Sequence, residues 1–301
     1  MRAFIAVTDG NWFRHLSALP DLDEVNFWQP SPHGFKALQP GEPLLFKLHH
    51  PEHFIVGGGF FAHYTALPCG TVWEAFGQRN GSATLDEMLA RITKYRHAPA
   101  TEATPIGCIL LEQPFFFPRD LWIPAPEDFA KNIVTGKTYD LKERTELWEA
   151  VQFRLLTQDL DLAEPEDPGE MFTEAWVRRR LGQGSFRALV TDAYERRCAV
   201  TGEKILPVLQ AAHIRPVTEG GLHRVDNGLL LRSDVHTLFD KGYLTVTPAY
   251  RLEVSQRLRE DFDNGAYYYD MRGQEIRLPQ PQTDRPDPTF REWHAETVFL
   301  R

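Results

Sequence analysis

Residues 198–242 of the 301-residue chain read CAVTGEKILPVLQAAHIRPVTEGGLHRVDNGLLLRSDVHTLFDKG. The short apolar run Ala211-Ala212-His213-Ile214 ends shortly before Pro216, which predicts a strand. Asn227-Gly228 is a turn dipeptide, and the apolar run Leu229–Leu231 predicts the strand that follows it. Two strands joined by a turned connection are therefore expected at the centre of this segment.

A short helix is expected directly after the second strand. Ser233 or Asp234 can cap its N-terminus. His236 and Asp240 lie four positions apart, so they share one face of that helix. The segment thus predicts strand, turn, strand, helix, with the imidazole of His213 facing an imidazole and a carboxylate on the helix.

This set of side chains suits metal-assisted hydrolysis of a phosphodiester, which needs a base for water and a cation for the developing charge. His213 is the candidate base because a neutral imidazole accepts a proton near pH 7. His236 and Asp240 are candidate ligands through one nitrogen and one hard oxygen. Asn227 is expected to support the site, since its amide can both donate and accept across the turn.

The same residues resemble the HNH endonucleases, which have a ββα-metal fold. Their three namesake positions fall on His213, Asn227 and His236. The resemblance implies that His213 is the general base, that Asn227 is the structural Asn, and that His236 binds a metal. Asp240 occupies a position where some members place another ligand. Mg²⁺ or Mn²⁺ is the expected ion, with other divalent transition metals left open.

One position departs from the pattern of that family. Many members have an Asp or His ligand immediately before the catalytic His, where this chain has Ala212. Asp240, Gln210 or water can supply the missing ligand. Asp240 can instead form an ion pair with Arg232 or Lys241. His223, in the connection after Gly220-Gly221, is interpreted as a loop residue.

Composition limits the class of protein. A chain of 301 residues is expected to form two domains that each bury a core. No apolar run reaches the length of a membrane span, and the first residues lack a signal peptide's pattern, so a cytoplasmic protein without a membrane partner is expected. The three cysteines are scattered, which argues against disulfides and against a structural zinc.

The net charge of −9 is unusual for a protein that binds nucleic acid. The charge is uneven, however, because residues 159–170 carry six acids and no base. Residues 171–250 hold eleven Lys and Arg against eight Asp and Glu. Two explanations of this basic excess are equally good. The residues can form a locally basic face around the nuclease segment, or they can belong to a pair of helices before residue 198 whose charges only face solvent. The side chains predicted to contact DNA are Arg79, Asn80, Arg196, Arg197, Arg215 and Arg232.

The remainder of the chain predicts a mixed α/β unit joined to the nuclease segment. Strands are expected at 4–7, 43–48, 54–59 and 107–112, and helices at 84–95 and 141–156. A further helix is expected over 172–194, broken near Gly182–Gly184. We expect four regions: a first domain over 1–115, a crossover and acidic linker with a helix over 116–170, the nuclease domain over 171–280, and a tail over 281–301.

Aromatic residues beside side-chain amides characterise the first region. With Pro40-Gly41-Glu42 and the run Gly57–Gly59, they resemble the PUA-like group, which includes the EVE, YTH and ASCH domains. The resemblance implies an α+β fold with a PUA-like β-barrel. Such side chains can stack on a base and bond its edge, although aromatics in a small barrel also serve as core. The expected base pocket consists of Trp12, Asn26, Phe27, Trp28, Gln29, Ser31 and Phe35.

A reader domain joined to an HNH nuclease resembles the modification-dependent restriction endonucleases. The resemblance implies double-stranded DNA with modified cytosine as substrate, either 5-methylcytosine or 5-hydroxymethylcytosine. A homodimer is expected if both strands are cut together, because one such site cuts one strand. Two alternatives remain open: an HNH nuclease that acts on unmodified DNA, and a binding protein whose nuclease site is inactive because of Ala212.

Overall fold

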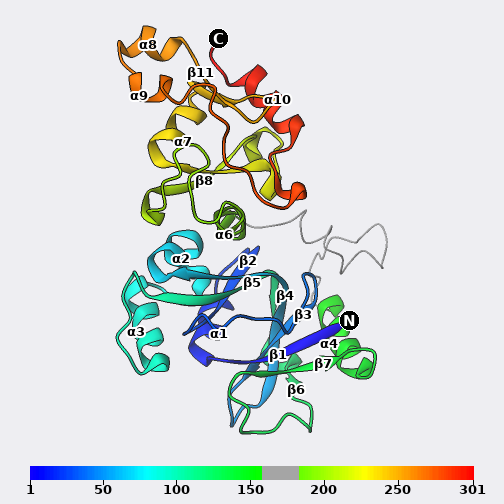
Figure 1. Cartoon of the computed structure of the whole chain (residues 1–301). Coiled ribbons are helices and arrows are strands. Elements are labelled where there is room, and N and C mark those ends of the chain that lie inside the picture. The colour runs from blue at the N-terminus through cyan, green and yellow to red at the C-terminus, as the bar shows by residue number, and fades with distance from the viewer. Residues whose placement is uncertain (158–182) are drawn as a thin grey trace. The chain divides into compact units, whose positions relative to one another are not determined.

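The computed structural model describes residues 1–157 and 183–301, which form two compact units, Met1–Ser185 and Phe186–Arg301 (Figure 1). The predicted acidic linker at 159–170, and residues 172–182 of the predicted helix, lie outside the described residues.

A mixed sheet organises the first unit, with strand order β2-β5-β4-β3-β1-β7 and with β6 paired to β4. Strands β1 and β3 are parallel, whereas the other pairs are antiparallel. The α+β class is therefore confirmed. Within the described residues the order is an open path, so closure into a barrel is not established. The strands are β1 (Arg2–Thr8), β2 (Glu24–Gln29), β3 (Pro43–Leu48), β4 (Phe54–Pro68), β5 (Pro105–Phe116), β6 (Ile123–Pro124) and β7 (Gly136–Asp140).

The glycines of β4 are explained by close packing within the sheet. A Cβ atom on Gly58 would lie 2.6 Å from the Phe115 ring and 2.8 Å from the carbonyl oxygen of Leu44. Only glycine leaves room for both neighbours at this point. The strand can therefore continue from Phe54 to Pro68, well beyond the predicted end at residue 59.

Successive residues of β3 face opposite sides of the sheet and enter two separate cores, as strand geometry requires. Leu44 and Phe46 pack with Trp12 on one side. Leu45 packs with Phe60 on the other side. The helices of this unit are α1 (Gly10–Leu16), α2 (Cys69–Phe76), α3 (Leu85–Arg96) and α4 (Thr145–Thr157), with short 3₁₀ turns η1 (Gly77–Asn80) and η2 (Arg119–Leu121).

Side-chain caps fix the start of two of these helices. The carboxylate of Asp9 accepts hydrogen bonds from the backbone N–H groups of Asn11 and Trp12, at 2.8 and 2.9 Å. The hydroxyl of Thr84 accepts from the N–H of Glu87, which confirms the predicted start of α3. Strand β7 pairs with β1, so the sheet includes residues beyond 115.

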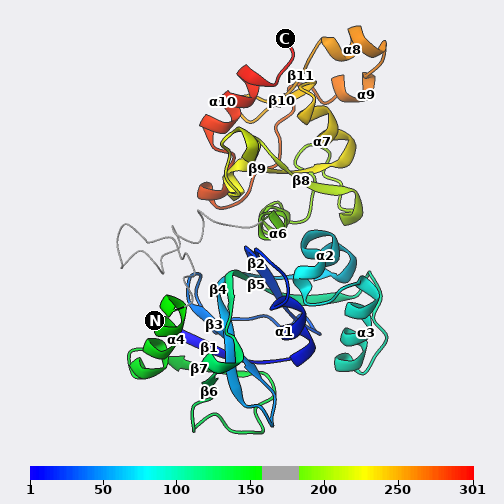
Figure 2. The ribbon, with the colours of Figure 1, turned by 180° about the vertical axis from the view of Figure 1, so that it is seen from behind.

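The second unit is built on a hairpin and a helix. Strands β8 (Leu209–His213) and β9 (Gly228–Arg232) are antiparallel, and His213 lies opposite Gly228. Helix α7 (Ser233–Asp240) follows β9 without a gap and lies against both strands (Figure 2). The predicted order of strand, turn, strand and helix is confirmed. The other elements are α6 (Gln183–Ala193), β10 (Leu244–Val246), β11 (Leu252–Val254), α8 (Arg257–Phe262), α9 (Ala266–Tyr269) and α10 (Pro288–Thr297), with 3₁₀ turns η4 (Leu206–Val208), η5 (Val217–Glu219), η6 (Val225–Asn227) and η7 (Gln282–Asp284).

The predicted cap of α7 is wrong. Arg232 is the capping residue, and no side chain accepts a hydrogen bond at this end. The carboxylate of Asp234 instead accepts two hydrogen bonds from the Arg232 guanidinium, at 2.6 and 2.7 Å. A paired, charge-assisted contact of this kind is stronger than a single bond to a backbone N–H group.

Helix α10 packs against α7. The His294 ring stacks on Phe239 of α7, with centroids 3.8 Å apart. Its two nitrogens contact the hydroxyl of Thr245 at 2.9 Å and the carbonyl oxygen of Phe239 at 3.2 Å. The segment predicted as a tail therefore contains a helix that packs on the nuclease fold. No helix within the described residues combines the length and apolar character needed to cross a membrane.

Candidate nuclease site and base pocket

His213 stands at the end of β8 and is partly buried against the Phe186 ring, with centroids 3.9 Å apart and planes 10° from parallel. Its Nε2 lies 3.0 Å from Nδ1 of His223. Burial, followed by the charges of His223 and His236, lowers the pKa of His213 to about 4. At neutral pH this imidazole is therefore uncharged and able to accept a proton.

His236 is held from two sides on α7. Its Nδ1 contacts Oε1 of Gln210 at 2.7 Å, and its Nε2 lies 3.2 Å from Oδ2 of Asp240. Because Oε1 only accepts, Nδ1 carries the proton and Nε2 is the nitrogen with the free lone pair. Gln210 thus lies behind the ring and orients it, whereas the sequence had suggested Gln210 as a ligand.

Asn227 is fully buried and joins the two ends of the loop between the strands. Its Oδ1 accepts from the backbone N–H of Arg215, and its Nδ2 donates to the carbonyl oxygens of Arg215 and Leu222, each at 2.9 Å. All three bonds go to backbone. The arrangement matches the supporting role that the sequence predicted for this residue.

Two side chains of α7, His236 and Asp240, are candidate donors to a divalent cation. Among the described residues, no group of three His, Cys, Asp or Glu side chains is arranged to hold a metal ion. Nε2 of His236 and Oδ2 of Asp240 are 3.2 Å apart, close to the ~3 Å between neighbouring donors in an octahedral shell with bonds of about 2.1 Å. Two protein donors completed by water and phosphate oxygens therefore fit a divalent ion, as is usual for Mg²⁺. Burial raises the pKa of Asp240, and the charge of His236 opposes that shift.

Ala212 explains why no ligand comes from the position before His213. Its side chain is fully buried in the core of the second unit, on the opposite side of the strand from its neighbour. Asp240 pairs with His236 rather than with Arg232 or Lys241. The sequence identifies His223 only as a loop residue, whereas the structure places it in contact with His213. The spacing of the two residues in the sequence does not indicate this contact.

Most side chains predicted to contact DNA already have protein partners. Asn80 is fully buried and accepts from the Asn26 amide at 2.9 Å, so the prediction of a phosphate contact for Asn80 does not fit the structure. Arg79 pairs with Asp23 and Glu24. Arg232 is neutralised by Asp234. Of the others, Arg196 lies 3.7 Å from Asp192, Arg197 is partly buried, and Arg215 lies over the Trp293 ring.

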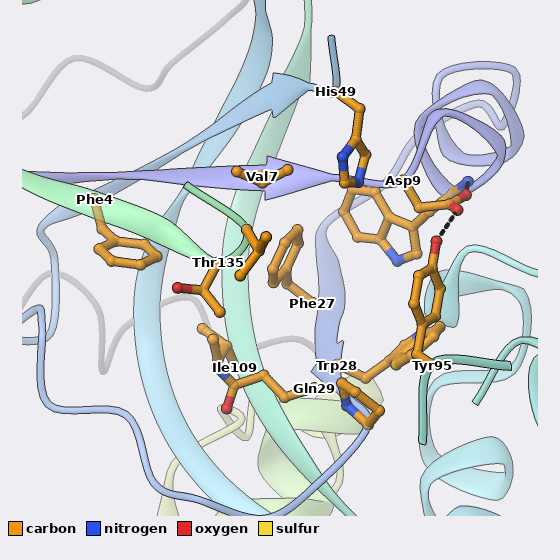
Figure 3. A pocket seen from close by; sticks show the side chains of 13 residues that line it. Phe4, Val7, Asp9, Phe27, Trp28, Gln29, His49, Tyr95, Ile109 and Thr135 are labelled. Carbon is orange, nitrogen blue, oxygen red and sulfur yellow. Dashed lines mark hydrogen bonds between the residues drawn. The ribbon is translucent and has the colours of Figure 1, made fainter. Parts of the chain in front are cut away.

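A pocket of about 370 Å³ opens in the first unit, within the size range of small-molecule sites (Figure 3). Four of the seven predicted base-pocket residues line it: Trp12, Phe27, Trp28 and Gln29. Buried atoms without a hydrogen-bond partner among the described residues include Nε1 of Trp12 and Oε1 of Gln29. A ligand in the pocket that comes within hydrogen-bonding distance can pair with either of these atoms. The remaining lining residues are Phe4, Val7, Asp9, Pro30, His49, Tyr95, Ile109, Val134 and Thr135.

Asp9 and Tyr95 are the pocket residues that sequence reasoning missed. The Tyr95 hydroxyl donates to Oδ2 of Asp9 at 2.5 Å, although the residues are far apart in the chain (Figure 3). Burial acts to raise the pKa of Asp9, but hydrogen bonds from Tyr95, Trp12 and Asn11 outweigh it and hold the pKa below its ordinary value. The pocket wall thus carries a fixed carboxylate at neutral pH.

Three predicted pocket residues lie elsewhere. The Asn26 amide donates to Asn80 inside the unit. Phe35 packs on Phe4 and Phe61, with ring centroids 5.2 and 5.3 Å away. Ser31 is partly exposed and does not line the cavity. Asn26 is fully buried and faces the opposite side of β2 from Phe27.

Comparison with known proteins agrees with the geometry of the second unit. Residues 198–247 match the HNH endonuclease family model. The chain therefore contains an HNH endonuclease domain and is a nuclease, a class that generally uses divalent metal ions. A search of curated proteins gave no match.

Solved structures with similarity to the chain include two proteins. The ASCH protein from Zymomonas mobilis is 10% identical, with a TM-score of 0.34, and the match covers 49% of this chain and 94% of that one. The modification-dependent TagI restriction endonuclease is 13% identical, with a TM-score of 0.30 and coverage of 99% of this chain and 83% of that one.

Proposed function

We propose that the protein is a divalent-metal-dependent endonuclease that cuts double-stranded DNA containing 5-methylcytosine or 5-hydroxymethylcytosine. The second unit carries the chemistry, and the pocket of the first unit reads the base. One observation supports this most strongly. The hairpin and α7 bring a buried, uncharged His213 and the His236–Asp240 pair into one small fold whose loop is fixed by Asn227.

In the proposed reaction, His213 removes a proton from water as the oxygen attacks phosphorus. The bond from phosphorus to the 3′ oxygen breaks, and that oxygen takes a proton from solvent. His236 and Asp240 would hold the cation, which would supply positive charge to the phosphate and leaving oxygens. Gln210 accepts the Nδ1 hydrogen of His236 and so leaves Nε2 of that ring free to bind a cation.

We propose that the pocket receives a cytosine turned out of the duplex. Phe27 and Trp28 offer aromatic surface for stacking. The carboxylate of Asp9 is an acceptor suited to the exocyclic amino group of cytosine. Phe27, Asp9 and Tyr95 come from separate elements and surround the same space in Figure 3. The closed β-barrel of the PUA-like group and a homodimer that cuts both strands remain part of this proposal.

A cleavage assay across Mg²⁺, Mn²⁺, Co²⁺ and Ni²⁺ tests the catalytic part. Wild type is expected to cut plasmid containing modified cytosine with at least one ion and to stop when the ion is chelated. The His213→Ala variant should lose at least about a thousand-fold in rate, since it removes the base. Cutting by wild type without any divalent ion, or equal cutting by both proteins, would contradict the proposed site.

A further inference from the structure

A second imidazole contacts the candidate base. His223 lies ten positions after His213, in the loop between the strands, and its Nδ1 is 3.0 Å from Nε2 of His213. The ring centroids are 5.0 Å apart and the planes meet at 61°.

The contact restricts where the protons lie. Two neutral imidazoles can share one N–H···N hydrogen bond, so one of the two nitrogens is protonated. If Nε2 of His213 carries the proton and donates to His223, then Nδ1 of His213 has the free lone pair. The reverse arrangement places the proton on Nδ1 of His213 and occupies its only basic nitrogen. Only the first arrangement leaves His213 able to accept a proton from water.

The loop that carries His223 is built to a fixed shape. A Cβ atom on Gly221 would lie 1.9 Å from the carbonyl oxygen of Arg215, so only glycine permits the loop to fold this closely. The N–H of Gly221 donates to the Pro216 carbonyl at 2.9 Å. Asn227 holds the next residue, Leu222, through its carbonyl oxygen. The backbone before His223 is therefore anchored twice.

Phe186 contacts both rings. It stacks on His213 and lies 5.7 Å from His223, measured between centroids. An aromatic wall on one side and a fixed loop on the other limit the rotation of His213. The pair of imidazoles is thus a packed arrangement and not a chance contact between two surface side chains.

We propose that His223 is the positioning residue of the general base, accepting the Nε2 hydrogen of His213 and thereby presenting Nδ1 to the attacking water. The inference rests on the proposed function and adds a residue to it. When water is deprotonated, its proton moves to Nδ1, a P–O bond forms, and the 3′ oxygen leaves. The positive charge on His213 is then stabilised by its hydrogen bond to Nδ1 of His223, in the way that an acceptor behind a general base orients and stabilises that base in other enzymes.

Three variants of the full-length protein test the role of His223. His223→Asn places an amide oxygen near the position of Nδ1, so it keeps an acceptor and should retain kcat within a few-fold. His223→Leu and His223→Ala have no acceptor and should lose about 10–100-fold in kcat, with little change in the affinity for DNA. Circular dichroism and the melting temperature verify folding.

The second readout is the tautomer of His213, which does not depend on cleavage. Nitrogen NMR of the histidine side chains at neutral pH is expected to show Nε2–H and unprotonated Nδ1 for His213 in wild type and in His223→Asn. His223→Leu should give a mixture of tautomers. His213→Ala assigns the signal by its loss.

The possible results distinguish the positioning role of His223 from the proposed nuclease function. Full kcat in His223→Leu, an equal loss in His223→Asn and His223→Leu, or Nδ1–H in wild type would overturn the positioning role. So would weaker DNA binding with unchanged kcat, which indicates a phosphate contact. If wild type cuts no DNA with any metal, the proposed function fails, and the NMR experiment still decides whether the contact sets the tautomer.

Discussion

Asn227 shows how one side chain can maintain a catalytic loop. Its amide bonds three backbone groups, two at Arg215 and one at Leu222, and it has no contact with solvent. Arg215 lies two positions after His213, and Leu222 lies directly before His223 in the chain. The distance between the two imidazoles therefore depends on Asn227, although its hydrogen bonds go to backbone groups and not to either ring.

Replacing Asn227 with Ala should weaken both the fold and the reaction. The change leaves buried backbone groups without partners, which costs about 2–3 kcal/mol of unfolding free energy. The cleavage rate should fall about 10–100-fold. Urea unfolding and single-turnover cleavage measure these effects, with Asn132→Ala, an exposed asparagine of the first unit, as a control. Unchanged cleavage by a folded Asn227→Ala protein would remove the residue from the site.

The pKa of His213 gives a prediction for pH dependence. Burial and the charges of His223 and His236 lower it to about 4. The base works only when it is neutral, so activity is present above its pKa and is lost as the pH falls through it. The acid limb of kcat/KM should therefore lie well below 6.5, the ordinary value for His. A midpoint at or above 6.5 would show that His213 is not in the buried, uncharged state described.

The proposed catalytic residues could be placed from the sequence because the motif is local. His213, Asn227 and His236 fall within 24 positions, and turn and strand signals place them without long-range information. The contacts of His223 and Gln210 depend on how the loop and helix pack, so spacing could not reveal them. The Asp9–Tyr95 pair joins residues 86 positions apart, which only the tertiary fold brings together.

At the scale of elements, α10 determines how firmly α7 is held. His294 is buried against Phe239, and its pKa is lowered to about 4, first by burial and with a hydrogen bond to Phe239 opposing that shift. The sequence suggested only a wrapped or trailing tail here, because proline and charge masked the helix. The cap of α7 was missed because Asp234 bonds a side chain in place of the backbone.

The low pKa of His294 predicts acid sensitivity of the second unit. The folded pKa is about 4 and the unfolded one about 6.5, so stability is held above pH 6.5 and lost as the pH falls toward 4. The effect is on the order of 2 kcal/mol. Melting temperatures of wild type and His294→Gln should differ most near pH 7 and converge near pH 4.5. A constant difference would contradict this account; His33→Gln, an exposed site, is the control.

At the scale of the whole molecule, the proposal divides reading and cutting between two units with separate cores. The mixed α+β class and the HNH domain followed from patterns in the sequence. The strand order of the first unit did not, because sheet order depends on long-range pairing such as that of β1 with β3 and β7. Four of the residues predicted for the base pocket line the cavity, because aromatic residues cluster on β2 and α1.

If one unit reads the base and the other cuts, substitutions in the pocket should change the preference for modified DNA and leave the cleavage step itself unchanged. Trp28→Ala removes a stacking surface worth about 1–3 kcal/mol, so the preference for modified over unmodified DNA should fall about ten-fold. Cutting of unmodified DNA should be unaffected. Phe153→Ala replaces an exposed aromatic residue outside the pocket and should behave as wild type. Competition cleavage with two labelled duplexes measures the ratio, and an unchanged ratio in Trp28→Ala would place reading elsewhere.

The most direct test of the central claim is digestion of plasmids that differ only in cytosine modification. Wild-type protein with a divalent ion is expected to cut plasmid carrying 5-methylcytosine or 5-hydroxymethylcytosine and to leave unmodified plasmid largely intact, while His213→Ala cuts neither. Equal cutting of modified and unmodified plasmid would contradict the account of the first unit as a reader of modified bases.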